Sequence, residues 1–120
     1  DVEELQLFFL GSGSRARTEQ VLEDFPELSA DYSSLYVEIY HKNASKGTAL
    51  SALAEQLGLA PAEIACMGDG DNDRSMFRAA GLRLAMGNCA DSLRPLADAV
   101  LPSNRESGAA AGIWEYVLKG

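Results

Sequence analysis

An acidic, glycine-rich stretch at residues 68–73 is the part of this sequence best suited to chemistry. It holds three aspartates, Asp69, Asp71 and Asp73, together with Asn72 and two glycines. Carboxylate oxygens are preferred ligands of hard divalent cations, and Mg²⁺ is often held by one or two carboxylates together with water and substrate phosphate. The stretch therefore points to a Mg²⁺ ion and to phosphoryl transfer.

Two simpler interpretations compete with this one. The spacing of Asp69, Asp71 and Asp73 matches the opening of a calcium-binding EF-hand loop, which requires glycine at its sixth place and glutamate at its twelfth. Arg74 and Ala80 occupy those places, which argues against an EF-hand. An ordinary helix cap would explain one aspartate, because acidic side chains suit a helix N-terminus, but not three with two glycines.

The elements around the acidic stretch place it at the end of a β-strand. A short apolar run at residues 64–67 precedes it, and Met76, Phe77 and Ala80 follow it on one side of a helical pattern. Ligands of an open parallel sheet bind beyond the carboxyl ends of its strands. The acidic turn therefore lies where a ligand is expected to bind.

The rest of this half of the chain alternates strands with helices. Residues 82–86 and 99–101 are typical of two further short buried strands, and residues 109–118 of a final helix. A short helix beginning near Asp91 would connect the two strands, and the apolar stripe of the final helix would pack against the sheet. This alternation predicts an α/β fold with a parallel sheet and right-handed crossovers.

Lys46 is the second candidate for chemistry. Ser45 is a suitable N-cap for a helix whose apolar residues recur with helical spacing over residues 50–57, and Gly58 is a suitable stop. A cation in the first turn opposes the helix dipole, so Lys46 would be stabilised by an anionic neighbour. A solvated surface lysine explains the same pattern equally well on composition alone.

The N-terminal part of the chain has a different pattern. Residues 5–10 and 34–40 are typical of strands, and residues 15–25 of a helix. We therefore predict two units: a strand–helix–strand unit at residues 1–42, followed by the α/β unit at residues 43–120.

Composition and charge argue against several classes of function. The chain of 120 residues carries a formal net charge of −8, so nucleic acids and acidic membrane surfaces are not expected partners. Cys66 and Cys89 lack disulfide or zinc spacing, and we expect both to be reduced, buried thiols. The sequence contains neither an apolar run long enough to span a bilayer nor a signal-peptide pattern, so the expected compartment is the cytoplasm.

Several short motifs together resemble one known family. In chain order they are Ser45-Lys46-Gly47, Gly68-Asp69-Gly70-Asp71-Asn72-Asp73 with Met76, Ala85-Met86-Gly87-Asn88-Cys89-Ala90, Ala97-Asp98, and Ser103-Asn104 before Gly108. Their order and spacing resemble the C-terminal part of the Cof-type sugar-phosphatase branch of the haloacid dehalogenase-like (HAD) superfamily. The resemblance covers residues 36–118, and the residues before Tyr36 are similar to the end of the cap domain that this branch inserts into its core.

The resemblance implies a Mg²⁺ cofactor and two-step hydrolysis of phosphate monoesters through an aspartyl-phosphate. In that pattern Lys46 is the catalytic lysine that bridges the nucleophile and the phosphate, and Asn72 orients Lys46 or a phosphate oxygen. Asp69 is a Mg²⁺ ligand, and Asp73 supports the metal or its waters.

The resemblance also implies a fold class and two lesser roles. The fold is a partial Rossmann-like (HAD) parallel sheet with helices on its faces, preceded by a remnant of an α+β cap. Asn88 shapes the loop beside the acidic turn. Asp71 occupies a variable place in the motif and is left out of the predicted site.

One part of the family pattern is missing from the sequence. The nucleophile and general acid of the family lie in a D-x-D-G-T stretch at the end of the first core strand, whereas Asp69-Gly70-Asp71 is followed here by Asn72. We therefore expect a fragment or half of a Mg²⁺-dependent phosphate monoester (sugar phosphate type) hydrolase that is inactive alone. Whether the chain is itself an enzyme stays open.

Two kinds of partner follow from that expectation. The intact enzyme would act on a small phosphorylated metabolite. The missing strand would leave an apolar strand edge open next to residues 64–67, and such edges recruit another chain. That chain is either a complementing N-terminal half or a second copy. The alternative function is a non-catalytic HAD-derived binding or interaction module that self-associates through this edge.

Overall fold

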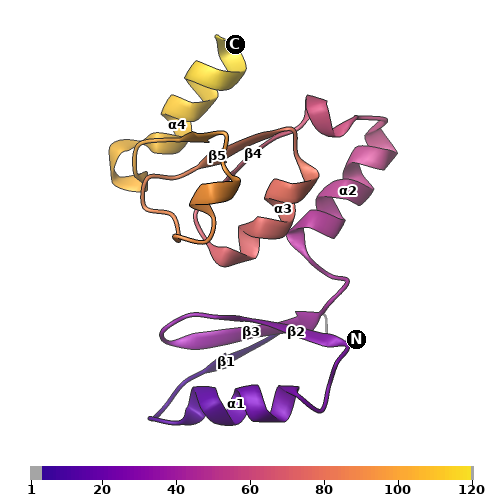
Figure 1. The fold of residues 1–120 in the computed structure, drawn as a ribbon, viewed down its shortest axis with the longest axis vertical. Helices are drawn as coiled ribbons and strands as arrows, with labels where there is room; N and C mark the ends of the chain where they lie inside the picture. Colours follow the sequence, from indigo (N-terminus) through magenta and orange to yellow (C-terminus); the bar gives the residue numbers. More distant parts are fainter. Residues whose placement is uncertain (1–3, 120) are drawn as a thin grey trace. The chain divides into compact units, whose positions relative to one another are not determined.

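The computed structural model describes residues 4–119 and divides the chain into two compact units. The first unit comprises Asp1–Ala44 and the second Ser45–Gly120. The division falls after Ala44, near the position after Lys42 that the sequence predicts. Each unit has its own three-stranded sheet (Figure 1).

The first unit is an antiparallel sheet with one helix against it (Figure 1). Its elements in chain order are β1 (Glu4–Phe8), α1 (Ser14–Leu22), β2 (Leu28–Tyr32) and β3 (Tyr36–His41). The strand order β1-β3-β2 places β3 in the centre, where it pairs with both neighbours. In β3, Val37 and Ile39 are buried while their neighbours are partly exposed, which is the alternation expected of a strand with one covered face.

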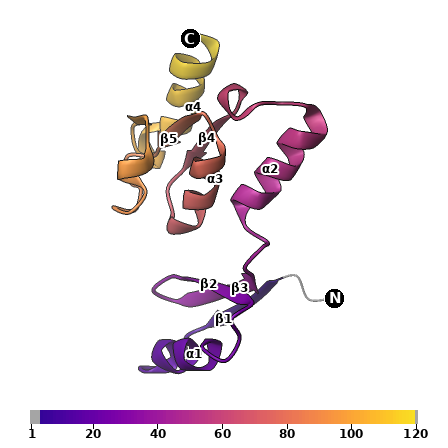
Figure 2. The ribbon, with the colours of Figure 1, turned by 45° about the vertical axis from the view of Figure 1, so that its right-hand side comes forward.

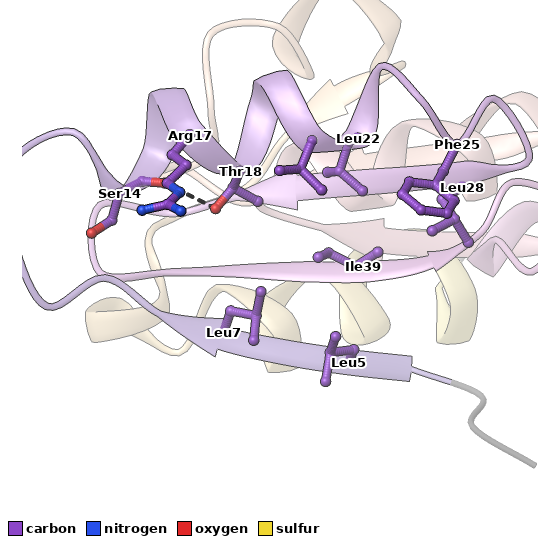
Figure 3. Close-up of a pocket in the computed structure, with 10 residues that line it drawn as sticks. Leu5, Leu7, Ser14, Arg17, Thr18, Leu22, Phe25, Leu28 and Ile39 are labelled. Atoms are coloured by element: carbon purple, nitrogen blue, oxygen red, sulfur yellow. Dashed lines mark hydrogen bonds between the residues drawn. The ribbon is translucent and has the colours of Figure 1, made fainter.

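The packing between α1 and the sheet is loose. A pocket of about 480 Å³ lies between them (Figure 3). Its walls are mainly apolar side chains, including Leu5 and Leu7 of β1, Ile39 of β3, and Val21 and Leu22 of α1. No residue of α1 is buried, so the helix contributes little to a closed core.

The structure contains a strand, β2, that the sequence does not predict. The strand–helix–strand pattern predicted for residues 1–42 is wrong on this point. The segment contains alanine and aspartate, which are poor strand formers, and its local pattern is therefore weak. It forms a strand because its backbone pairs with β3, from Leu28 opposite His41 to Tyr32 opposite Val37. The first unit is therefore strand–helix–strand–strand.

The second unit is a parallel sheet between helices (Figures 1 and 2). Its main elements are α2 (Lys46–Leu57), β4 (Ala65–Gly68), α3 (Arg74–Ala79), β5 (Leu82–Ala85), β6 (Ala99–Val100) and α4 (Gly108–Gly112), with a π-helical segment (Ile113–Leu118) after α4. The strands are parallel in the order β4-β5-β6, which confirms the predicted α/β fold. Between residues 4 and 119, no helix combines the length and apolarity needed to cross a membrane.

Both faces of the parallel sheet carry buried side chains. On one face, Cys66 of β4 and Ala85 of β5 pack in a cluster with Phe77 of α3. A second cluster contains Leu84 of β5 and Leu101, which follows β6. Because adjacent residues of a strand point to opposite faces, Leu84 and Ala85 belong to different clusters.

Cys66 and Cys89 are both free and buried, as predicted. Burial raises the pKa of the Cys66 thiol to about 11, so this side chain remains protonated at neutral pH. Since the thiolate is the reactive form, Cys66 acts as a small apolar core residue.

The connection between β5 and β6 is tighter than the sequence predicts. In place of an α-helix beginning near Asp91, the structure has a short 3₁₀ helix, Arg94–Leu96. The chain rejoins β5 immediately afterwards, because the N–H of Asp98 donates to the backbone oxygen of Arg83 at 2.8 Å. Because the chain returns to β5 at Asp98, the connection contains only one turn of 3₁₀ helix.

The C-terminal helical segment exposes apolar side chains, and β4 has an unpaired edge among the described strands. Ile113, Trp114, Val117 and Leu118 are 43%, 57%, 51% and 67% exposed, so the prediction that this stripe packs against the sheet is wrong. Among the described strands, β4 pairs with β5 alone and lies at one end of the sheet. The open strand edge predicted beside residues 64–67 is therefore present in the structure.

The buried side chain of Leu84 offers a test of the core of the second unit. Leu84 is 0% exposed, whereas Leu57 of α2 is 62% exposed. We expect Leu84→Ala to lower the free energy of unfolding by about 2–5 kcal/mol, because it leaves a cavity in the core. Leu57→Ala is the matched control and should cost less than about 1 kcal/mol. Urea unfolding measures both values, and equal losses would contradict this assignment of the core.

Candidate functional site

The candidate site lies where β4 and β5 end. β4 leads into the acidic turn, and β5 leads into the loop at residues 87–90. Two backbone hydrogen bonds hold these segments side by side: Met86 N–H donates to Gly68 O at 2.9 Å, and Ala90 N–H donates to Asp69 O at 2.8 Å. The acidic turn is therefore held at the carboxyl edge of the sheet, as the sequence predicts.

Asp73 is the centre of the acidic turn. Its Oδ2 accepts hydrogen bonds from the backbone N–H groups of Asp69 at 2.9 Å and Gly70 at 3.1 Å. Its Oδ1 accepts a hydrogen bond from Lys46 Nζ at 2.5 Å. The residue is only 4% exposed, so these donors replace the water that a carboxylate would otherwise bind.

The absence of a side chain at Gly68 allows Asp73 to occupy this position. A Cβ at Gly68 would lie 2.6 Å from both Cβ and Oδ2 of Asp73, which is closer than non-bonded atoms can approach. The glycine at the end of β4 is therefore required by the carboxylate that folds back over it.

Burial and hydrogen bonding act on the pKa of Asp73 in opposite directions. Burial raises the pKa, because it disfavours the charged form. The hydrogen bond from Lys46, the two backbone N–H groups and the charge of Lys46 lower it, and their combined effect is larger. The net pKa lies below the usual value for an aspartate, so Asp73 is ionised at neutral pH.

The structure supplies the anionic neighbour that Lys46 needs. Lys46 is the first residue of α2, and Ser45 caps this helix through a hydrogen bond from Thr48 N–H to Ser45 Oγ at 3.1 Å. The side chain of Lys46 is 51% exposed, but its ammonium is paired with the buried carboxylate of Asp73. Of the two interpretations of Lys46, the paired lysine is correct.

A close contact between α2 and α3 holds the base of Lys46. The backbone N–H of Gly47 donates to Ser75 Oγ at 3.0 Å. A Cβ at Gly47 would lie 2.4 Å from the backbone oxygen of Ser75, so the two helices meet almost backbone to backbone. Gly47, next to Lys46, and Ser75, two residues after Asp73, are therefore joined as well.

Asp69 differs from Asp73 because its side chain is exposed. Asn88 Nδ2 donates to Asp69 Oδ2 at a long 3.4 Å, and Asn88 Oδ1 accepts a hydrogen bond from Asn104 N–H at 2.8 Å. Asn88 thus links three loops at this edge of the sheet, which agrees with its expected role in shaping the loop. The second oxygen of Asp69 remains available to a ligand.

The remaining polar residues of the turn lie at its rim. Asn72 is half-buried in a single 3₁₀ turn, Asp71–Asp73, and no hydrogen bond joins its carboxamide to Lys46 among the described residues. Asp71 is exposed and accepts a hydrogen bond from Ser92. Asp71 therefore lies outside the cluster of Lys46 and Asp73.

Two residues of this network, Ser75 and Ser92, were not singled out by the sequence. Asn104 belongs to the Ser103-Asn104 motif of the resemblance, but no role was assigned to it. Ser75 and Ser92 act through single hydroxyl groups, and Asn104 acts through its backbone N–H, so residue type does not predict these contacts. Only Gly47, next to Lys46, hints at a close approach of two backbones.

The described residues form an incomplete set of metal ligands. Within residues 4–119, no group of three or more His, Cys, Asp or Glu side chains is arranged to hold a metal ion. Both oxygens of Asp73 already accept hydrogen bonds, whereas Asp69 is exposed and has a free oxygen. Mg²⁺ is commonly bound through one or two carboxylates with waters and phosphate, so Asp69 fits this cation as a direct ligand.

Comparison with known proteins identifies the family. The pattern of haloacid dehalogenase-like hydrolases matches residues 7–113. The chain belongs to this family. Phosphatase YwpJ of Bacillus subtilis is 47% identical over 73 residues, which are 61% of this chain and 26% of that protein.

Solved structures share the fold of this HAD-family chain. A haloacid dehalogenase-like hydrolase from B. subtilis superposes with a TM-score of 0.85 at 32% identity, over 96% of this chain and 41% of that chain. A HAD subclass IIB sugar phosphatase has a TM-score of 0.83 at 22% identity, over 97% of this chain and 44% of that chain. The family resemblance of the motifs is therefore confirmed.

The matched proteins are much longer than this chain. The chain spans 31%, 26% and 34% of the lengths of three curated relatives that it matches. The chain therefore corresponds to about a third or less of the length of each of these HAD-family proteins.

The exchange Gly47→Ala should destabilise the second unit. A Cβ would collide with the backbone of Ser75 and force α2 away from α3. Overpacking of this kind costs about 1–3 kcal/mol, which exceeds the gain of roughly 0.5–1 kcal/mol for alanine over glycine in a helix. Urea unfolding measures the change. Ser51→Ala, at an exposed position of the same helix, should stay within about 0.5 kcal/mol of the wild type. An unchanged stability for Gly47→Ala would contradict the close contact.

The exchange Asp73→Asn should destabilise the chain in a pH-dependent way. At pH 7 the loss should be about 1–3 kcal/mol, because Lys46 and two N–H groups lose an anionic acceptor. The folded pKa of Asp73 lies below the unfolded value of roughly 3.9. The stabilisation is therefore complete above the unfolded pKa and is lost as the pH falls through the folded pKa.

Urea unfolding at several pH values between about 3 and 7 measures this dependence. The difference between wild type and Asp73→Asn should be largest near neutral pH and should shrink below about pH 4. Asp71→Asn is the matched control, because Asp71 is exposed, and it should have little effect at any pH. A constant difference down to the lowest pH would show that the charge of Asp73 does not contribute.

Proposed function

We propose that this chain forms the part of a Mg²⁺-dependent phosphate monoester hydrolase that binds the metal and neutralises the transferring phosphoryl group. The observation that carries the proposal is the pairing of Lys46 with Asp73 at the carboxyl edge of a parallel sheet, beside the exposed carboxylate of Asp69. Ligands of open parallel sheets bind at this edge. The family match and phosphatase relatives support the same conclusion.

Lys46 has the chemistry that phosphoryl transfer requires. Its side chain is 51% exposed, so the ammonium can donate to a phosphate oxygen while it remains paired with Asp73. An ammonium group beside the phosphate offsets the negative charge that is redistributed in the transition state. Asp73 keeps the ammonium in position, and Asn72 at the rim of the turn would orient Lys46 or a phosphate oxygen.

Asp69 would hold the metal ion. When bound, Mg²⁺ polarises a phosphoryl oxygen and neutralises its charge. Asp69 would contribute its free oxygen, while Asn88 holds the other oxygen and Asp73 binds the backbone N–H of the same residue. Asp73 would support the metal site through the turn or through metal-bound waters.

The nucleophilic aspartate of this reaction is not among the residues of the sequence. We propose that a D-x-D-G-T segment supplies it from a strand parallel to β4, in the same polypeptide or in a complementing chain. The edge of β4 is open, and a groove of about 240 Å³ beside it is lined by apolar residues that include Leu53, Leu57 and Leu59. A buried apolar strand fits this edge, and its carboxyl end would lie near Asp69.

The same edge supports a second candidate function. A non-catalytic module that self-associates through β4 would cover the same apolar groove. A stable dimer without turnover would favour this candidate. A monomer by light scattering would exclude it.

The proposal includes a substrate class and a compartment. A small sugar phosphate is the expected substrate, in line with the sugar-phosphatase resemblance of the motifs. The net charge of −8 is unfavourable for polyanionic substrates such as nucleic acid. The cytoplasm remains the compartment expected from the sequence.

Turnover by a longer gene product tests the proposed function. A protein that joins this chain to a D-x-D-G-T segment should release inorganic phosphate from sugar phosphates only when Mg²⁺ is present. Lys46→Met should lower kcat by about 10²–10³-fold, the usual effect of removing one donor to a developing negative charge. Lys42→Met is the matched control and should retain activity, because Lys42 is an exposed residue of the first unit. Lack of Mg²⁺-dependent turnover in the longer protein would contradict the proposal.

A further inference from the structure

The first turn of α2 is held by two residues of the segment that follows the acidic turn. Lys46 Nζ donates to Asp73 Oδ1 at 2.5 Å, and Gly47 N–H donates to Ser75 Oγ at 3.0 Å. Lys46 and Gly47, which are adjacent in α2, therefore bind Asp73 and Ser75, which are two positions apart. The two bonds differ in kind, because the first involves a flexible side chain and the second involves the backbone.

The hydrogen bond to Ser75 satisfies a donor that α2 cannot satisfy itself. The first N–H groups of a helix have no partner within the helix. Ser45 Oγ accepts from Thr48 N–H, which leaves Gly47 N–H to a partner outside the helix. Gly47 is buried, so water is a poor substitute for the hydroxyl of Ser75.

The position of the Lys46 ammonium depends on where the helix begins. A lysine side chain has four rotatable bonds, and holding it in one arrangement costs up to about 2 kcal/mol of conformational entropy. The side chain is half exposed, so packing around it does not restrict it strongly. Its Cα must therefore be held at a suitable distance from Asp73 for the ammonium to stay on the carboxylate.

We propose that Ser75 is a positioning residue for Lys46. Its hydroxyl anchors the backbone next to Lys46 and thereby sets the distance from which the ammonium reaches Asp73 and a bound phosphate. The phosphate part of this inference rests on the proposed function, whereas the effect on the contact between Lys46 and Asp73 does not.

A simple helix cap is the alternative role for Ser75. A cap would stabilise α2 and the fold without changing how strongly Lys46 and Asp73 interact. The two roles are therefore separated by the coupling between Lys46 and Asp73, which is independent of overall stability. A double-mutant cycle with Lys46→Met and Asp73→Asn measures this coupling from the unfolding equilibrium.

The cycle is measured in three backgrounds: wild type, Ser75→Ala and Ser75→Thr. In the wild type, the coupling should change the unfolding equilibrium constant by about tenfold, as expected for a charge-assisted hydrogen bond. In Ser75→Ala it should fall below about threefold, because the backbone next to Lys46 loses its anchor. Ser75→Thr keeps the hydroxyl, and a groove beside Ser75 of about 450 Å³ has room for the added methyl, so the coupling should return.

A serine elsewhere in the unit provides the matched control. Ser103 Oγ donates to Glu106 Oε2 at 2.6 Å in a short turn that no hydrogen bond among the described residues joins to Lys46 or Asp73. Ser103→Ala should lower stability and leave the coupling at its wild-type value. Coupling that stays at about tenfold in Ser75→Ala would overturn the proposal and leave Ser75 as a helix cap.

Two further measurements keep the test decisive. If Ser75→Ala does not fold, the cycle is measured in Ser75→Cys, whose thiol is a weaker acceptor for the Gly47 N–H. Reduced coupling supports the anchor, and coupling at the wild-type value overturns it. In the longer protein with a D-x-D-G-T segment, Ser75→Ala should lower kcat by about tenfold, and Ser75→Thr should restore it. If Lys46→Met leaves turnover unchanged there, the proposed function fails, while the coupling still decides the role of Ser75.

Discussion

The second unit depends on the buried carboxylate of Asp73. A carboxylate removed from water costs several kcal/mol unless donors replace the lost hydration. Here two backbone N–H groups of the turn and the ammonium of Lys46 replace it. Because the amides belong to the turn that follows β4 and the ammonium belongs to α2, this one side chain joins that turn to the preceding helix. Gly68 makes the arrangement possible by leaving space above the strand.

Much of this arrangement is predictable because its signals are local. The apolar run before the acidic turn and the helical spacing after it predict a strand, a turn and a helix, and β4 and α3 are found there. The unfavourable place of Lys46 in the first turn of a helix predicts an anionic neighbour, and Asp73 is that neighbour. The motif resemblance adds the expected roles of Lys46, Asp69 and Asp73, which periodicity alone cannot assign.

The parts that the sequence does not predict depend on contacts between distant segments. β2 has a weak local pattern and forms because β3 pairs with it. The hydroxyl of Ser75 matters because Gly47, 28 positions away in the chain, brings an unpaired N–H to it. The sequence predicts the helical segment near the C-terminus but not the exposure of its apolar stripe, because exposure depends on which other segments pack against it. Trp114 of that stripe is 57% exposed.

Asp73 also determines which chemistry is left to the other residues. Under the proposed function, direct metal binding falls to Asp69, whose carboxylate is exposed, because Asp73 is buried and its oxygens already accept hydrogen bonds. A Mg²⁺ ion held by one carboxylate and waters is bound weakly, so the proposed site gains from a second carboxylate. The open edge of β4 is the place from which a parallel strand would deliver it, because the carboxyl ends of parallel strands meet at one edge of the sheet. Under the proposed function, one strand of the D-x-D-G-T segment would therefore both cover the apolar groove beside β4 and supply the nucleophile.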